Sequence, residues 1–289
     1  MNSFNSGEGF LAIISSRRVL SPIVVSFDEL NISGIDEKED EMVDRFIDVQ
    51  KELGYRKNAI PRHYPFEIST NSLTFTGILD DKNYVYIFLL LATRSNMNVY
   101  RQLGGVDGTL VFEELCQIAL AKFFGPNSQS FLFGTSIQGT FESKVQNLIT
   151  RAGIGRRLEN RGNNIAIQKD DGIDIVAYLD FHDKRDSKLV AFGQCKTGVY
   201  WRDSIKKLDP ESFVDNWLLD SPAFKPIKVV MISDVLTAQN NLRKDLIDSK
   251  ALFFTRFRIM EYLPEVIESE VIIKIKRWVD GRLSNFSLS

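Results

Sequence analysis

The chain has little of the chemistry that builds disulfide frameworks or zinc sites, with only two cysteines and two histidines in 289 residues. Cys195 is expected to point inward on a strand, so the sequence favours a reducing compartment over a disulfide framework. Neither cysteine has a histidine neighbour, which leaves a Cys/His zinc site little to build from. His63 and His182 alone also give a Ser-His-Asp triad little support.

Long apolar runs and phosphate-binding glycine loops are missing as well. The longest apolar run covers residues 84–92, far short of the roughly 20 residues that a membrane helix needs. The first ten residues lack the basic-then-apolar order of a signal peptide, and no Walker-type loop appears. We therefore expect a globular, cytoplasmic protein with no membrane partner and no ATP hydrolysis.

Net charge of either sign is also nearly absent. The formal charge is −2, and 44% of the residues are hydrophobic, enough for one large or two modest domains. Any contact with nucleic acid must then come from a local basic patch. The candidate nucleic-acid-binding residues are Lys144, Arg151, Arg156, Arg157, Arg161 and Lys169. The same residues could instead form a solvated helix end with a cationic last turn.

Composition and periodicity divide the chain into two predicted domains, 1–127 and 128–289. The first is predicted to be mostly helical, with an acidic helix at 36–53 and apolar elements at 84–93 and 108–124. Its predicted role is the selection of substrate or the binding of a partner. Residues 125–130 are the best linker candidate.

The second predicted domain alternates helices and strands. A helix is expected at 139–151, a strand near 163–168, hairpin strands at 172–181 and 188–196, and helices between 201 and 219. A strand at 226–233, a helix near 238–248, a strand at 251–255 and a long final helix complete the order. This pattern predicts an α/β fold of three layers around a central mixed sheet.

The polar residues of the predicted hairpin are the most informative feature of the chain. Side chains in a strand alternate between faces, so Gln194 and Lys196 should point one way and Cys195 the other. Asp174 on the neighbouring strand can share the face of Gln194. One carboxylate, one amide oxygen and one ammonium group would then converge on a single patch.

Such a patch suits a divalent cation and a phosphate. Mg²⁺ prefers oxygen ligands and keeps several waters, so few protein ligands suffice. Asp174 would be the main ligand and the backbone carbonyl of Cys195 another. The Lys196 ammonium could orient the attacking water or offset charge on the phosphate.

These residues resemble the PD-(D/E)xK superfamily of restriction-endonuclease-like nucleases, in the variant where Gln precedes x-Lys, and most closely the Mrr-type enzymes. The likeness covers about residues 139–200. It also reaches Phe141-Glu142, which matches the Phe-Glu pair that those families carry on a helix before the Asp. The resemblance implies a site of Glu142, Asp174, Gln194 and Lys196, with Mg²⁺ or Mn²⁺ held by Asp174, Glu142, Gln194 and the Cys195 carbonyl. Because Gln194 is neutral, the ion should bind more weakly than with Glu.

Each residue also has an ordinary structural reading. Asp174 could complete a turn, Lys196 could be a solvated strand residue, and Glu142 could be a surface helix residue. Glu113 and Glu114 are rivals for the role of Glu142.

Two functions from different classes follow. The first is a metal-dependent nuclease acting on DNA, which the resemblance places in restriction, anti-phage defence or repair. The second is an inactive nuclease-like module that binds nucleic acid or scaffolds a complex. A separate protein subunit and a second copy of the chain are further candidate partners.

Overall fold

The computed structural model of the protein describes residues 23–26, 39–69, 72–78, 80–134, 138–162, 169–183, 185, 187–198, 200–236 and 242–286. Its internal contacts divide the chain into two compact units. Unit 1 comprises Met1–Gly108 with Glu268–Ser289, and unit 2 comprises Thr109–Ile267. In the described part, no helix is both long and apolar enough to cross a membrane.

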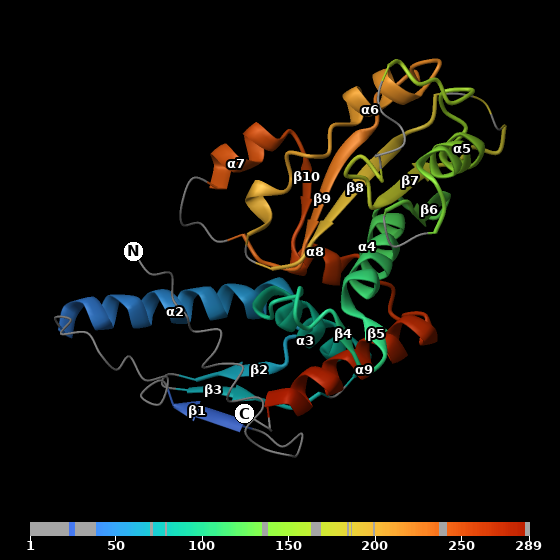
Figure 1. Ribbon diagram of the computed structural model, residues 1–289. Helices are drawn as coiled ribbons and strands as arrows, with labels where there is room; N and C mark the ends of the chain where they lie inside the picture. Colours follow the sequence, from blue (N-terminus) through green and yellow to red (C-terminus); the bar gives the residue numbers. More distant parts are fainter. Residues whose placement is uncertain are drawn as a thin grey trace. The chain divides into compact units, whose positions relative to one another are not determined.

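Unit 2 is built on one five-stranded mixed sheet with the spatial order β10-β9-β8-β7-β6 (Figure 1). The strands β6, β7 and β8 run antiparallel to one another, whereas β9 and β10 run parallel to β8. Their bounds are β6 Ser128–Leu132, β7 Ile175–Leu179, β8 Val190–Lys196, β9 Ile227–Ile232 and β10 Leu252–Phe254. The α/β class and the central mixed sheet predicted from the sequence are therefore confirmed.

Helices cover both faces of this sheet. The helices are α4 Gly108–Phe124, α5 Phe141–Ala152, η2 Trp201–Asp203, α6 Pro210–Trp217, α7 Leu242–Ser249 and α8 Arg256–Glu261. Apolar residues of α5 and α6 pack with Phe192 and Val190 of β8 in one core. On the opposite face of β8, the thiol of Cys195 hydrogen-bonds the thiol of Cys116 from α4. Alternation along one strand thus assigns α4 to one face and α5 with α6 to the other.

Local sequence explains the ends of the two helices on the α5 face. The side chain of Thr140 accepts a hydrogen bond from the Ser143 N–H and caps the start of α5, and Gly153 ends it in a left-handed conformation. Asp209 caps α6 by accepting from the N–H groups of Glu211 and Ser212. The sequence-predicted helix and the observed α5 agree within two residues.

Unit 1 combines helices with small antiparallel sheets. Its helices are α2 Glu39–Ala59, α3 Asp81–Arg94 and α9 Ser269–Phe286, and its strands are β1 Ile23–Ser26, β2 Phe66–Ile68, β3 Ser72–Phe75, β4 Gln102–Leu103 and β5 Val106–Asp107. Strand β3 lies between β1 and β2, and β4 pairs with β5. The Trp278 ring of α9 packs edge-on against Phe88 of α3, with 5.2 Å between ring centroids.

Three organisational expectations differ from this structure. A mostly helical first domain is not supported, because the described part of unit 1 holds five short strands beside its helices. The unit boundary falls at Gly108 rather than at residue 127, and the final helix belongs to unit 1. Residues 128–130 of the expected linker are the start of β6, which pairs with β7 as the sheet's edge. The strand expected near 163–168 lies outside the described residues.

Candidate active site at the end of the β7–β8 hairpin

Asp174 lies immediately before β7, one residue beyond the Ile175–Gly193 pair. Its N–H donates to the Gly193 carbonyl at 2.8 Å, and its Oδ2 accepts a 2.7 Å hydrogen bond from the Cys195 N–H. The N–H and C=O groups of one strand residue point toward the same neighbouring strand. The Cys195 carbonyl is therefore directed to the side on which Asp174 lies, as expected for a candidate metal ligand.

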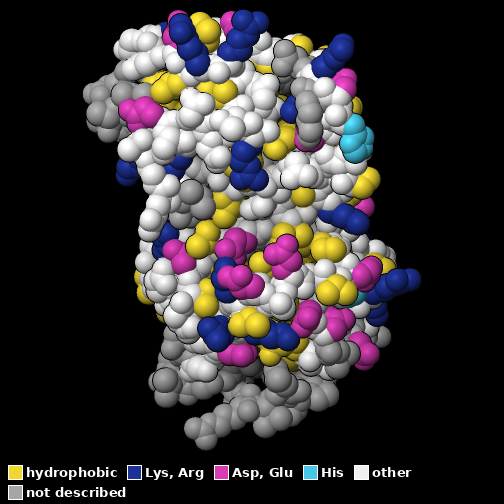
Figure 2. Space-filling model, turned by 90° about the vertical axis from the view of Figure 1, so that its right-hand side faces the viewer, with side chains coloured by type: hydrophobic (Ala, Val, Ile, Leu, Met, Phe, Trp, Pro, Cys, Tyr) yellow, Lys and Arg dark blue, Asp and Glu magenta, His cyan; other side chains and the backbone are white. Residues whose placement is uncertain are grey.

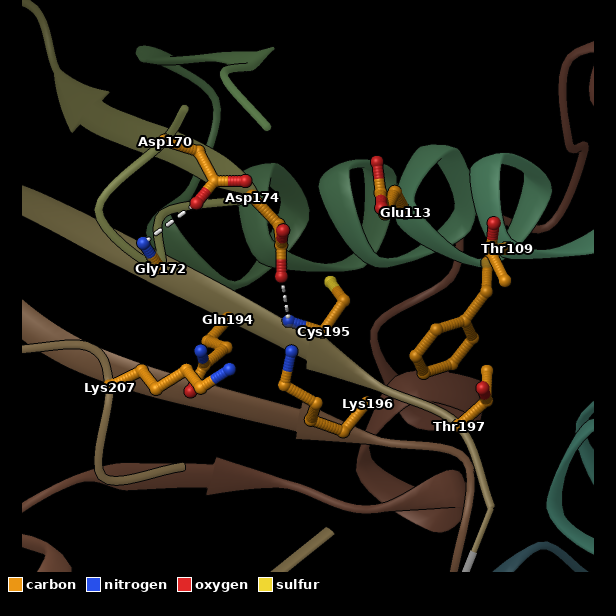
Figure 3. A pocket seen from close by; sticks show the side chains of 11 residues that line it. Thr109, Glu113, Asp170, Gly172, Asp174, Gln194, Cys195, Lys196, Thr197 and Lys207 are labelled. Carbon is orange, nitrogen blue, oxygen red and sulfur yellow. Dashed lines mark hydrogen bonds between the residues drawn. The ribbon is translucent and has the colours of Figure 1, made fainter. Parts of the chain in front are cut away.

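A cavity of about 370 Å³ opens at this end of the hairpin. Its wall includes Thr109, Phe112, Glu113, Asp170, Gly172, Asp174, Gln194, Cys195, Lys196, Thr197 and Lys207. Figure 3 shows the Asp174 carboxylate and the Lys196 ammonium approaching the Cys195 backbone from two sides. The structure thus brings together four of the residues that the sequence singled out, namely Asp174, Gln194, Cys195 and Lys196.

The loop after β6 holds the backbone of Asp174 in position. Phe133 and Gly134 donate their N–H groups to the Asp174 carbonyl at 2.8 and 3.2 Å. A Cβ atom on Gly134 would lie 3.0 Å from Asp174 Oδ1, so only glycine allows this approach without displacement. The buried Lys144 ammonium donates to the Gly134 carbonyl at 2.7 Å and holds the loop in place.

Burial sets the protonation of Asp174. The side chain is 9% exposed, and burial raises its pKa to about 6. The nearby Lys196 charge and the Cys195 N–H lower the pKa, whereas the neighbouring Asp170 raises it. A cation near this carboxylate would favour the ionised form.

Gln194 is the most deeply buried polar residue of the cavity, at 1% exposure. Its side-chain oxygen Oε1 is buried and has no hydrogen-bond partner among the described residues. Buried polar atoms are almost always paired, so an orphaned acceptor calls for an explanation such as an ion or water. A hard cation is one ligand that would satisfy this oxygen.

The acidic residue that reaches the cavity from a helix is Glu113 of α4 and not Glu142. Glu142 lies in the first turn of α5 and is not part of the cavity wall. Glu114, the other rival, is also outside that wall. The apolar stripe of α5 packs on the core that contains Val176 and Phe192, which fixes the helix by its stripe and leaves Glu142 at its edge. The structure therefore brings Glu113 into the cavity wall and leaves Glu142 outside it, and a role of either residue in holding a metal stays a prediction.

The residues fit a cation of the magnesium type better than one of the zinc type. In the described residues, no three His, Cys, Asp or Glu side chains come close enough together to hold a metal ion. Asp174 and the Gln194 oxygen, with the Cys195 carbonyl beside them, offer oxygen ligands only. Mg²⁺ accepts such a partial set because it retains several waters, with Glu113 within the same cavity.

Most of the predicted DNA-binding cations already serve the protein itself. Lys144 is buried on Gly134, and Arg161 donates to the carbonyls of Leu218 and Leu219. The Arg151 guanidinium lies 4.2 Å from the Phe131 ring centroid. Lys144 therefore lies within the protein as a support of the site, whereas Arg151 and Arg161 combine a contact within the protein with an exposed side chain.

Five of the six are exposed, and Lys144 alone is buried. Arg156 forms an ion pair of 2.8 Å with Asp220 while 81% exposed, and Arg157 lies 3.8 Å from Glu159 while 71% exposed. Lys169 is exposed as well. On the face drawn in Figure 2, Lys and Arg side chains are scattered in small groups and form no continuous basic surface.

Sequence reasoning missed several residues of the cavity wall. Asp170 and Gly172 precede Asp174 within four residues, so their proximity could have been inferred from the tight turn. Thr109 and Lys207 come from segments distant in the sequence, and no pattern in the sequence marks them.

Comparison with known proteins adds no relative: no family model, no curated protein and no solved structure matches the chain.

Proposed function

We propose that the protein is a metal-dependent nuclease that hydrolyses phosphodiester bonds of DNA, with its active site in the cavity of unit 2. One observation carries the proposal. The buried, unpartnered Gln194 oxygen lies in one cavity with a carboxyl group of raised pKa, Asp174, and with the Lys196 ammonium. The helix-covered mixed sheet is the kind of core that the resemblance to PD-(D/E)xK nucleases implies.

Asp174, Gln194 and the Cys195 carbonyl would hold Mg²⁺ or Mn²⁺. The bound ion would supply Lewis-acid stabilisation of the charge that develops on the phosphate. Glu113, on α4, would act on the same ion through water.

Lys196 has the second role in this proposal. Its half-buried ammonium donates to the water that attacks phosphorus or to a non-bridging phosphate oxygen, and stabilises charge that grows in the transition state. The new P–O bond forms as the bond to the leaving deoxyribose oxygen breaks. The attacking water gives up a proton to solvent, and the leaving oxygen takes a proton from solvent. Asp174 must be ionised for this reaction. Its pKa of about 6 applies without a cation, and a bound cation would lower that pKa, so activity should fall at a pH below about 6.

The test is cleavage of plasmid and linear duplex DNA with Mg²⁺ or Mn²⁺. Asp174→Asn and Lys196→Ala should each lower the rate by roughly 10²- to 10⁴-fold, the range of a positioned charge or proton-transfer group. Matched controls are Asp215→Asn and Lys206→Ala, which change exposed residues outside the cavity wall. Wild-type rates in both site variants would refute the assignment, and cleavage of RNA but not DNA would refute the substrate.

A second candidate is a module that binds nucleic acid without cutting it. Two observations favour it: the neutral Gln194, and the lack of a three-residue metal cluster in the described residues. Thermal unfolding with added Mn²⁺ separates the two functions, because an ion that binds only the folded state raises its stability. A nuclease site predicts an increase in midpoint that Asp174→Asn removes, whereas a metal-free module predicts none.

Restriction, anti-phage defence and DNA repair are the settings we propose for this activity, by analogy with the nuclease families that the motif resembles. Selection of substrate or of a partner subunit would fall to unit 1.

A further inference from the structure

Lys207 is a cavity residue that the proposed chemistry leaves without a role. It lies in the segment between η2 and α6, and its side chain shares the cavity with Gln194 and Lys196 (Figure 3). The neighbouring Lys206 is also exposed but is not part of the wall. Position, and not residue type, therefore distinguishes the two lysines.

The backbone at Lys207 is held in place on three sides. Leu208 is 1% exposed in the core beneath α5 and α6, and Asp209 caps α6. Gly172 packs against the chain here, since a Cβ on it would lie 3.2 Å from the Lys207 carbonyl carbon and 3.1 Å from the Leu208 nitrogen. A fixed backbone reduces the conformational entropy lost when the side chain binds a ligand.

Gly172 also ties this segment to the catalytic hairpin. The same Cβ would lie 3.3 Å from the Gln194 amide nitrogen, so Gln194 and Lys207 flank one glycine. At a φ of +80° that position favours glycine in any case. The Lys207 side chain extends from this junction, and no ion pair joins it to a carboxylate in the part of the chain that the structure describes.

Charge balance points to the ligand. Glu113, Asp170 and Asp174 supply three carboxylates to the cavity, and Lys196 and Lys207 supply two ammonium groups. With all five ionised the cavity carries one excess negative charge. One divalent cation turns this into one positive charge, which one phosphodiester group neutralises. Without Lys207, the cavity with its cation would be neutral and would gain a net negative charge on binding the phosphate.

We propose that Lys207 binds a non-bridging oxygen of the substrate phosphate in this cavity. It is an anion-binding residue and acts in substrate affinity more than in bond cleavage. The inference rests on the proposed nuclease function for the identity of the substrate, but the binding of phosphate itself can be measured without cleavage.

The first experiment follows thermal unfolding of the full chain against inorganic phosphate in the presence of Mg²⁺, for wild type, Lys207→Ala, Lys207→Arg and Lys206→Ala. Phosphate also stabilises proteins without binding a site, and this general effect is common to all four. Wild type, Lys207→Arg and Lys206→Ala should show an additional rise in midpoint that Lys207→Ala lacks. An equal response of Lys207→Ala and Lys206→Ala would overturn the proposal.

The second experiment measures DNA cleavage by the same variants. Lys207→Ala should raise KM about tenfold, because a charge-assisted contact is lost, with a much smaller change in kcat. A KM equal to that of Lys206→Ala would overturn the role of Lys207 while the nuclease function stands. Phosphate binding that depends on Lys207, in a protein that cuts no DNA, would support the anion site and refute the nuclease.

Discussion

Two regions of the protein differ in how far their polar groups are already paired within the protein. One is the cavity at the end of the β7–β8 hairpin, and the other is the group of basic residues from Lys144 to Lys169. In the cavity, the Gln194 oxygen has no hydrogen-bond partner and the buried Asp174 carboxyl has a raised pKa. In the basic group, Lys144 and Arg161 are bound to backbone carbonyls, and Arg156 pairs with Asp220. A buried, incompletely paired site is where an external ligand gains most. A cation that already has a partner has less to offer.

A charged residue in the sequence therefore indicates a ligand site only if the folded protein does not already provide that residue with a partner. The segment 144–169 has the more obvious pattern in the sequence. The cavity residues form a less obvious pattern in the sequence, but burying their polar groups costs more free energy. Four changes test this contrast.

The largest effect on stability is expected at Asp174. A carboxyl whose folded pKa is raised from 3.8 to about 6 holds its proton more tightly in the folded state. Its contribution to folding is therefore fully present below pH 3.8 and is lost as the pH rises through 6. Asp174→Asn cannot ionise, so at pH 7.5 and without metal it should be more stable than wild type by about 2 to 3 kcal/mol.

Urea unfolding at pH 4 and pH 7.5 measures this difference. The Asp215→Asn variant is the control, because its carboxyl is exposed. A gain for Asp174→Asn that is the same at both pH values would contradict the assigned ionisation.

The next largest effect, a loss of stability, is expected for Lys144 in the basic group. Lys144→Met keeps the apolar stem but removes the donor to the Gly134 carbonyl. An unsatisfied buried acceptor costs about 1 to 3 kcal/mol, so the free energy of unfolding should fall by that amount. The salt dependence of DNA binding should not change, because the Lys144 ammonium is directed into the protein. A lower salt slope in this variant would restore Lys144 as a DNA contact.

A smaller effect is expected for metal affinity. Gln194→Glu adds a carboxylate beside Asp174 and should tighten Mn²⁺ binding at pH 8 by roughly tenfold, or about 1.4 kcal/mol. Isothermal titration measures the affinity, and Gln129→Glu on the exposed face of β6 is the matched control. Equal affinities in the wild type and Gln194→Glu would remove this residue from the cation site.

The smallest effect is expected at the exposed arginines. Reversing Arg156 and Arg157 to Glu together should weaken DNA binding by less than about tenfold and lower the salt slope by roughly one unit per lost contact. Their present pairs with Asp220 and Glu159 are exposed and therefore weak. Titration of a duplex at several salt concentrations decides the matter. An unchanged slope would show that these two arginines are solvated surface residues that do not contact DNA.

Much of the fold followed from local patterns. The apolar run of β8, the apolar stripe of α5 and the predicted apolar element at 108–124 all depend on residues close in sequence. The unit boundary did not follow, because the pairing of β6 with β7 and of α9 with α3 depends on contacts between distant segments. The short strands of unit 1 carry too few residues to show a period.

The hairpin, and the alternation that sets Gln194 and Lys196 on one face, follow from the sequence alone, because a strand has a period of two residues. Asp174 followed as their neighbour through the same pairing. Three features become visible only in the folded protein: Glu113 and not Glu142 reaches the cavity, Lys144 is buried, and Lys207 joins the wall. Which helix lies over a strand end is decided by the packing of apolar stripes over the whole sheet, and no local spacing encodes that choice.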